Sequence, residues 1–249
     1  MTIQMTLQEI EEKLKILHED NHIIVVVKPR NIPSQADNTG DLDLLSLIKN
    51  YLKLKYDKKG NVYTGLVHRL DRPTGGVMVF AKTDKAASRL SEQLREHEMQ
   101  KRYLAVVAGT PKIRVGKLIH YLIKDERQNI VKCHSANIAN SKKAELEYKV
   151  LDNTDDGLSL VDINLITGRS HQARVQMAAI GHQLYGDHKY NPTGKTVGYG
   201  KQLALWSYSL SFTHPTKGNT HVFKVFPPTL DEPWNYFSIE KHIPIVRPT

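Results

Sequence analysis

The sequence of 249 residues contains a single cysteine, Cys133. One thiol excludes a disulfide framework and leaves too few thiolates for a cysteine-rich zinc site, which favours a reducing compartment and a cytoplasmic location. Long apolar runs are also lacking, because the most apolar stretch, residues 23–27, is far shorter than the ~20 residues that cross a membrane. Glutamates interrupt residues 1–17, so no secretory leader is expected there. The sequence therefore predicts no association with a membrane.

Motifs for a metal or a small-molecule cofactor are lacking as well. The 12 histidines are scattered, and His182 and His188 have no further ligand at zinc spacing. Residues 152–163 contain the aspartates of a calcium loop but end on Ile163, where a glutamate ligand is required. A phosphate-binding loop at residues 194–196 would need a glycine at the position of Lys189. We therefore expect no metal site and no nucleotide-hydrolysing loop.

Charge is unevenly balanced between the two signs. The chain has 35 Lys and Arg residues against 26 Asp and Glu residues, which gives a net charge of +9. Such an excess favours polyanionic partners, because phosphate groups are neutralised and their counterions released. Nucleic acid is thus the first partner to consider, although many basic proteins bind none.

Hydrophobic periodicity predicts an irregular mixture of helices and strands. Helices are expected at residues 6–17, with Thr6 and Glu9 in capping-box spacing, at 42–55, from Asp84 to about Gln100, and briefly between Gly168 and Gly181. Strands are expected at residues 22–28, 77–82, 101–107, 144–150, 158–165, 204–212 and 221–226. This order points to an α+β fold around a mixed, mostly antiparallel sheet.

One polar segment, residues 65–76, lies between apolar stretches and contains Asp71. Arg69 and Arg72 flank this aspartate, and nearby positive charge favours the ionised carboxylate that a nucleophile needs. The same Arg-x-Asp-Arg pattern is also common in surface ion pairs. On these residues alone, both interpretations stay open.

Two further segments combine basic and aromatic residues. In Lys101-Arg102-Tyr103, at the start of a predicted strand, Lys101 and Tyr103 share one face. The tyrosine could stack on a base or simply pack at the edge of the core. In residues 167–176, Thr167 or Ser170 could cap a helix from which Arg174 reaches a cleft, although such helices are often merely half solvated.

Taken together, these segments resemble the RluA-type RNA pseudouridine synthases of the RluA/RsuA superfamily in order and spacing. The matching motifs are His68-Arg69-Leu70-Asp71-Arg72-Pro73-Thr74, Lys101-Arg102-Tyr103, and Thr167-Gly168-Arg169-Ser170-His171-Gln172-Ala173-Arg174 with Gly181-His182 and Gly186-Asp187. The opening His18-Glu19-Asp20 through Lys28-Pro29 also looks like that family's first motif. The resemblance runs from about residue 18 to residue 226.

The resemblance implies the pseudouridine synthase fold, with a central mixed sheet, flanking helices and a catalytic cleft. It implies a catalytic domain over residues 18–249, preceded by a helical extension at 1–17, acting as a monomer on rRNA or tRNA without a cofactor. Asp71 would be the catalytic aspartate, Tyr103 the tyrosine packed against the target base, and Arg174 the basic residue paired with the aspartate. Residues expected to contact RNA are His68, Arg69, which would help expel the uridine, Arg72, Lys101, Arg169 and His171.

Two other functions are weighed against a uridine isomerase. A non-catalytic RNA-binding or ribosome-assembly factor would suit the charge equally well, with Lys49, Lys53 and Lys55 or the loop carrying Lys195 and Lys201 as contacts. A metal-dependent nuclease would use Asp71 and His68. Release of tritium from uracil C5 in bulk RNA separates the isomerase from the binding factor, and a chelator separates it from the nuclease.

Overall fold

A computed structural model describes residues 5–191 and 197–244, and the chain divides into two compact units. Unit 1 comprises Met1–Met99 and Ser209–Val225, and unit 2 comprises Gln100–Tyr208 and Phe226–Thr249. Within the described residues, no helix is both long enough and apolar enough to cross a bilayer. The boundary expected between residues 17 and 18 stays a prediction.

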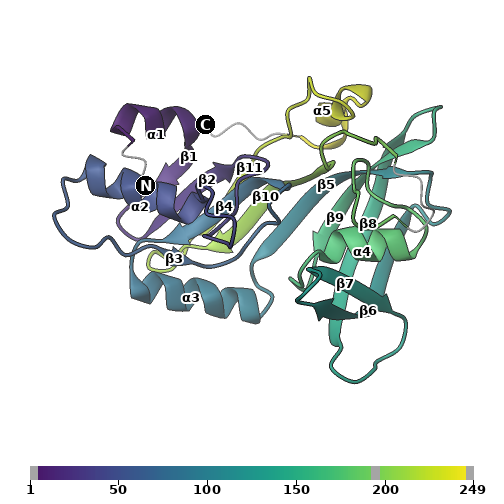
Figure 1. Cartoon of the computed structure of the whole chain (residues 1–249), viewed down its shortest axis with the longest axis horizontal. Helices are drawn as coiled ribbons and strands as arrows, with labels where there is room; N and C mark the ends of the chain where they lie inside the picture. The colour runs from purple at the N-terminus through teal and green to yellow at the C-terminus, as the bar shows by residue number, and fades with distance from the viewer. Residues whose placement is uncertain (1–4, 192–196, 245–249) are drawn as a thin grey trace. The chain divides into compact units, whose positions relative to one another are not determined.

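Unit 1 is a small sheet with three helices (Figure 1). Its elements are α1 (Leu7–Lys13), β1 (Lys15–Glu19), β2 (Ile23–Lys28), α2 (Leu44–Lys55), β3 (Gly65–Leu66), β4 (Gly75–Ala81), α3 (Asp84–Arg95), the second part of β10 (Leu205–Thr213) and β11 (Thr220–Lys224). The strand order is β1-β2-β4-β10, with β11 on β10 and β3 on β4. The β1–β2, β2–β4, β3–β4 and β10–β11 pairs are antiparallel.

Strands β2 and β4 form the centre of unit 1 because every residue in both is buried. Their sequences, IIVVVK and GGVMVFA, are rich in β-branched and large apolar residues, which is typical of strands covered on both faces. Ala86 and Leu90 of α3 pack into the same core as Val25 and Val79. Since β4 follows the Asp71 segment directly, that segment is anchored to a rigid strand.

Unit 2 is a sheet flanked by short helices (Figure 1). Its elements are the first part of β10, β5 (Gln100–Ala108), β6 (Val115–Asp125), β7 (Ile130–His134), β8 (Lys142–Asn153), β9 (Leu158–Leu165), α4 (Gln172–Ala179), the 3₁₀ helix η1 (Trp234–Tyr236) and α5 (Ile239–His242). The strand order is β10-β5-β9-β8-β6-β7, and the pairs from β5 to β7 are all antiparallel.

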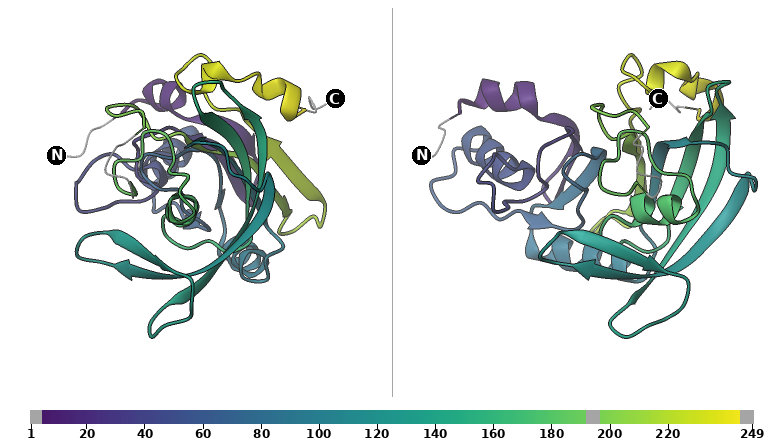
Figure 2. Two further views of the ribbon diagram at one scale, coloured as in Figure 1. Left: turned by 90° about the vertical axis from the view of Figure 1, so that its right-hand side faces the viewer. Right: turned by 45° about the vertical axis from the view of Figure 1, so that its right-hand side comes forward.

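Helix α4 lies against β6 and β7, where Val175 and Ala178 pack with Ala144 of β8. Figure 2 shows the strong twist of the long strands β8, β9 and β6 in this unit, as expected for antiparallel strands of their length.

The predicted α+β class is confirmed, and three helix boundaries are corrected. The Thr6–Glu9 capping box is present, but the first helix ends at Lys13 and residues 15–19 form β1 instead. Helix α3 is capped by Thr83 rather than Asp84 and ends at Arg95. Helix α4 follows His171, whose side chain makes no capping bond, so neither Thr167 nor Ser170 is its cap. Strands β6 and β7 were not predicted.

Candidate active-site elements

Asp71 lies in the loop between β3 and β4, on unit 1. Its own side chain is partly exposed, whereas Leu70 before it and Thr74 after it are buried. The Thr74 backbone N–H donates to the Asp71 carbonyl over 2.9 Å, which closes a tight turn at the aspartate. The loop therefore presents one carboxylate from a segment whose flanks are fixed.

The segment that follows β2 braces this loop through two side chains and one main-chain bond. The buried Ser34 hydroxyl donates to the Leu70 carbonyl over 2.9 Å and accepts the Leu70 N–H over 3.1 Å. The Asn31 N–H and the Lys28 ammonium both donate to the Arg72 carbonyl, over 2.8 and 3.0 Å. The two residues adjoining Asp71 are thus held on both sides.

Lys28 is the most buried basic side chain at this loop, with no exposed surface. Its ammonium donates to the carbonyls of Pro29, Ile32 and Arg72 over 2.9, 2.6 and 3.0 Å, which uses its three N–H bonds. Burial lowers the pKa of Lys28 to about 7, and the negative charge of Asp71 works in the opposite direction. Lys28 belongs to a motif that the sequence shows, but no role was predicted for it. A lysine at the end of an apolar strand was a signal that could have indicated a buried, structurally important cation.

The basic residues beside Asp71 have other partners. The Arg72 guanidinium forms ion pairs with Asp41 and Asp37, on the loop before α2. His68 is buried, and its Nε2 accepts the Val79 N–H of β4 over 3.3 Å. Arg69 is exposed. Of the three RNA contacts predicted in this loop, Arg69 is therefore the most accessible to solvent and His68 the least.

Arg174, on α4 of unit 2, is buried in a bidentate ion pair with Asp187. Its Nε and one terminal nitrogen lie 2.7 and 2.8 Å from the two Asp187 oxygens. Burial opposes ionisation of Asp187, but the guanidinium lowers the pKa of that carboxyl below its ordinary value. Arg174 also lies 5.2 Å over the Tyr190 ring, within cation–π range. Asp187 belongs to the Gly186-Asp187 motif of the sequence, but its pairing with Arg174 was not predicted.

The strand face predicted for residues 101–103 is confirmed in β5. Lys101 and Tyr103 are both 6% exposed, whereas Arg102 between them is exposed and forms an ion pair with Asp162. Tyr103 lies opposite Ile163 of β9. Burial lowers the pKa of Lys101 to about 8.

The loop from Thr167 to Gln172 is clamped to β8 at Glu145. The Glu145 carbonyl accepts from the Thr167 N–H over 3.1 Å and from the Gln172 side chain over 3.0 Å. The Gln172 side-chain oxygen accepts the Arg169 N–H, while the Arg169 side chain bonds the Lys143 carbonyl. This network fixes the backbone that leads into α4.

His171 closes that loop with a left-handed backbone at φ 52°, a region that few residues other than glycine adopt. Its Nδ1 lies 2.6 Å from the Tyr190 hydroxyl, which also accepts the Val131 N–H. The tautomer of His171 decides which of the two groups donates in this hydrogen bond. His171 and Arg174 thus share Tyr190 as a neighbour.

The remaining lysines considered as RNA contacts differ in whether an ion pair holds them. Lys55 is paired with Glu19, and Lys201 with Glu232, whereas Lys49 and Lys53 lie exposed on α2. Lys195 lies outside the described residues. No group of three or more potential metal ligands occurs within residues 5–191 and 197–244.

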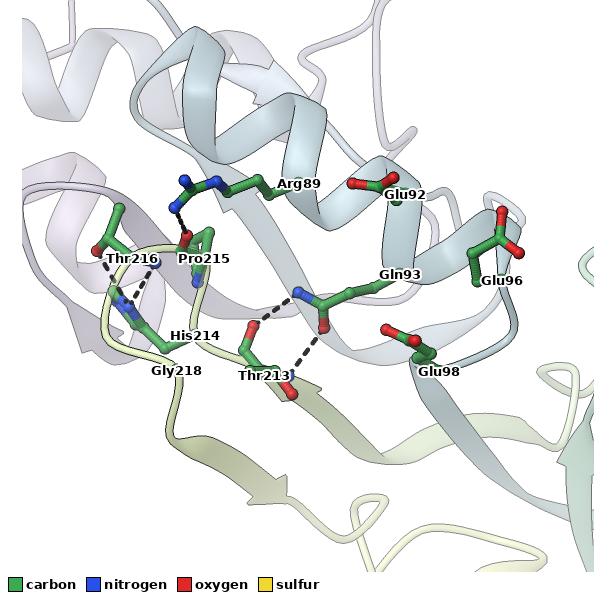
Figure 3. A pocket seen from close by; sticks show the side chains of 10 residues that line it. All are labelled: Arg89, Glu92, Gln93, Glu96, Glu98, Thr213, His214, Pro215, Thr216 and Gly218. Carbon is green, nitrogen blue, oxygen red and sulfur yellow. Dashed lines mark hydrogen bonds between the residues drawn. The ribbon is translucent and has the colours of Figure 1, made fainter.

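A pocket of about 460 Å³ in unit 1 involves none of these residues (Figure 3). The end of α3, residues 213–216 and Gly218 line it, and the Gln93 amide is bonded to both backbone groups of Thr213 over 2.8 Å. Glu92, Glu96 and Glu98 also line it. Three carboxylates against a single arginine disfavour a polyanionic ligand, so we assign no RNA contact to this pocket.

The predicted site residues fall into two groups, one in each unit. His68, Arg69, Asp71 and Arg72 share one loop of unit 1. Those in unit 2 are Lys101, Tyr103, Arg169, His171 and Arg174. The meeting of the two groups in one site is a proposal.

Comparison with known proteins identifies the class to which this fold belongs. Two solved human structures, RNA Pseudouridylate Synthase Domain Containing 4 and Domain Containing 1, superpose with TM-scores of 0.73 and 0.71 at 23% and 22% identity. They cover 89% and 91% of this chain, and 91% and 87% of their own. The chain therefore has the pseudouridine synthase fold.

Sequence relatives specify the family more closely. The model of the RNA pseudouridylate synthase family matches residues 22–179. The Dual-specificity RNA pseudouridine synthase RluA of Escherichia coli is 35% identical over 220 residues, 86% of this chain and 93% of the relative. The Ribosomal large subunit pseudouridine synthase D of Zymomonas mobilis is 33% identical over 214 residues, 82% of this chain and 66% of the relative. The chain belongs to the RNA pseudouridylate synthase family, and it is an isomerase that acts on uridine in RNA.

Proposed function

We propose that Asp71 is the nucleophile of the isomerisation, that Arg174 pairs with it and that Tyr103 packs against the target uracil. The observation that carries this proposal is the bracing of the Asp71 loop, where Lys28, Asn31 and Ser34 fix the residues on either side of a partly exposed carboxylate. Such fixed flanks are what preorganised catalytic groups require.

The reaction defines what the three side chains have to do. The bond between uracil N1 and ribose C1′ breaks, the base turns, and C5 joins C1′, while C5 loses its hydrogen and N1 gains one. Because the base is detached between these steps, the site must hold it without covalent attachment to the sugar. An ionised carboxylate attacks the nucleotide, and the bond that it forms is broken again before the product leaves, which regenerates the free carboxylate. A guanidinium stabilises that carboxylate, and an aromatic side chain packs against the base as it turns.

The proposed substrate is structured ribosomal or transfer RNA, bound by the positively charged catalytic body. The net charge of +9 supports such a partner, as do the names of the two relatives, one dual-specific and one acting on the large ribosomal subunit. The proposed RNA contacts are His68, Arg69, Arg72, Lys101, Arg169 and His171. We further propose a cytoplasmic monomer, which sedimentation and cell fractionation can test.

The decisive experiment measures tritium released to water from bulk tRNA and rRNA labelled at uracil C5. Asp71→Asn keeps the shape of the side chain but removes its negative charge, so we expect release to fall at least ~10³-fold. Asp155→Asn, on an exposed turn, is the matched control and should leave release unchanged. Full-rate release by Asp71→Asn would end the proposal.

The identity of the substrate needs a separate measurement. Pseudouridines mapped in the RNA of a deletion strain and its parent should differ at specific rRNA or tRNA positions. The sites lost in the deletion strain name the substrate directly.

A further inference from the structure

Lys101 stands apart from the other buried cations. Only 6% of the residue is exposed, yet within the described residues its ammonium has no hydrogen-bond or ion-pair partner. Buried charges in proteins are ordinarily paired, because removing an ammonium from water is costly. An unpaired ammonium in this setting points to a partner that arrives with the substrate.

The ammonium is also accessible from outside, because it ends beside Gly168. A Cβ atom built on Gly168 would lie 3.2 Å from the Lys101 Nζ, so the two are direct neighbours. Gly168 itself is exposed, and a glycine leaves the approach to the ammonium open. The aliphatic part of Lys101 is thus buried, while its ammonium lies next to the exposed main chain of Gly168.

The main chain around that point is rigid and offers donors. The Glu145 clamp holds Thr167 and Gln172 in place on either side. Within the part of the chain that the structure describes, the N–H groups of Gly168 and Ser170 donate no hydrogen bond to protein. Backbone N–H groups beside a fixed cation form a concave site suited to an anion.

We propose that Lys101, together with the Gly168 main chain, binds one phosphate group of the RNA substrate. A phosphate oxygen carries a formal negative charge, so it binds an ammonium more strongly than the neutral carbonyl of uracil does. The inference rests on the proposed function, because it takes RNA as the substrate, and it names the group of that RNA that this site recognises.

The test compares Lys101→Met with the wild type, in the full-length chain, for binding of bulk tRNA at several salt concentrations. Methionine keeps an unbranched stem of similar length, and the loss of an unpaired charge should not lower the thermal midpoint. We expect tRNA affinity to fall about 10- to 100-fold. The slope of log affinity against log salt should become shallower by about 0.7 to 0.9, the value for one phosphate contact. Lys149→Met, an exposed lysine of β8, is the matched control.

A second variant leaves the charge in place. Gly168→Ala has an ordinary backbone angle and should fold, but its methyl group narrows the approach to the ammonium, so a several-fold loss of tRNA affinity is expected.

Three outcomes would overturn the inference. Salt slopes that coincide for Lys101→Met and the wild type would exclude a phosphate contact. A fall in kcat with unchanged affinity would assign the lysine to the base instead. Inorganic phosphate that binds the wild type but not Lys101→Met, while the tRNA slopes coincide, would make the site one for free phosphate. The salt slopes and the binding of inorganic phosphate do not depend on tritium release, so a failure of this inference can be told apart from a failure of the proposed function, which tritium release tests.

Discussion

Removal of the Ser34 hydroxyl should disturb the Asp71 loop more than its size suggests. The hydroxyl serves both backbone groups of Leu70, at 2.9 and 3.1 Å, and the two residues are only 5% and 6% exposed. Ser34→Ala removes a single oxygen atom, which leaves too little space for a water molecule to replace it. The substitution therefore leaves a buried N–H and a buried C=O without their partner.

The magnitude follows from these two orphaned groups. Each buried polar group that loses its partner costs about 1–3 kcal/mol, so for the two groups together we expect the free energy of unfolding to fall by about 2–6 kcal/mol. With a urea m-value of about 2 kcal/mol/M, a loss of 2 kcal/mol lowers the urea midpoint by about 1 M. Urea unfolding followed by far-UV circular dichroism measures this shift.

Activity should respond as well, because Leu70 directly precedes Asp71. A displacement of about 1 Å at a reacting group can cost ~10²-fold in rate. We expect kcat in the tritium assay to fall at least ~10-fold, with KM changed little, since the loop carries the reacting group rather than most of the RNA contacts. Ser91→Ala, on the exposed side of α3, removes the same hydroxyl and should stay within about 0.5 kcal/mol of the wild type. If Ser34→Ala matched that control in both stability and kcat, the bracing argument would be refuted.

Two further substitutions probe buried charges in each unit. Burial opposes ionisation of Glu19, but hydrogen bonds from Lys55 and Lys82 at 2.8 and 2.7 Å outweigh it and lower the pKa of Glu19 to about 2. Its stabilisation is therefore present above pH 4.5 and lost as the pH falls toward 2. Because the Lys55 side chain is 38% exposed, we expect Glu19→Gln to lose about 1–2 kcal/mol at pH 7 and less than about half of that at pH 3, as measured by urea unfolding at both pH values. Asp187→Asn leaves the Arg174 guanidinium buried without its counter-charge, so a loss of about 3–5 kcal/mol in the same measurement is expected, and an unchanged midpoint would contradict it.

Local sequence patterns predicted most elements because their causes were local. The run from Ile23 to Val27 and the alternation of residues 144–150 are visible without tertiary information, and both are strands in the structure. The errors arose where tertiary pairing decided the outcome. Residues 15–17 continue a helical stripe in sequence, but pairing with β2 makes them a strand. Tertiary pairing routinely overrides a weak helical preference at the end of a short helix.

The candidate site divides in the same way. Motif order singled out Asp71 and Arg174 as candidates, because residue types and their spacing are properties of the sequence. It could not identify Ser34 or Asp187 as partners, since Ser34 lies 36 residues from Leu70 and Asp187 lies 13 residues from Arg174. Nothing in the sequence states which distant backbone a serine will reach, so bracing residues emerge only from the fold.

The described residues bury three lysine or arginine side chains, and their surroundings explain why only one of them implies an external ligand. Lys28 donates to three main-chain carbonyls, and Arg174 is matched by the two oxygens of Asp187. Both cations therefore have acceptors within the protein itself, and for Arg174 this does not depend on the proposed pairing with Asp71. Lys101 is buried to a similar extent but has no such acceptor within residues 5–191 and 197–244, and it ends at an exposed glycine. The protein supplies acceptors for two of its buried cations but, within the described residues, none for Lys101. An anion that the substrate supplies best explains this ammonium without an acceptor near the surface.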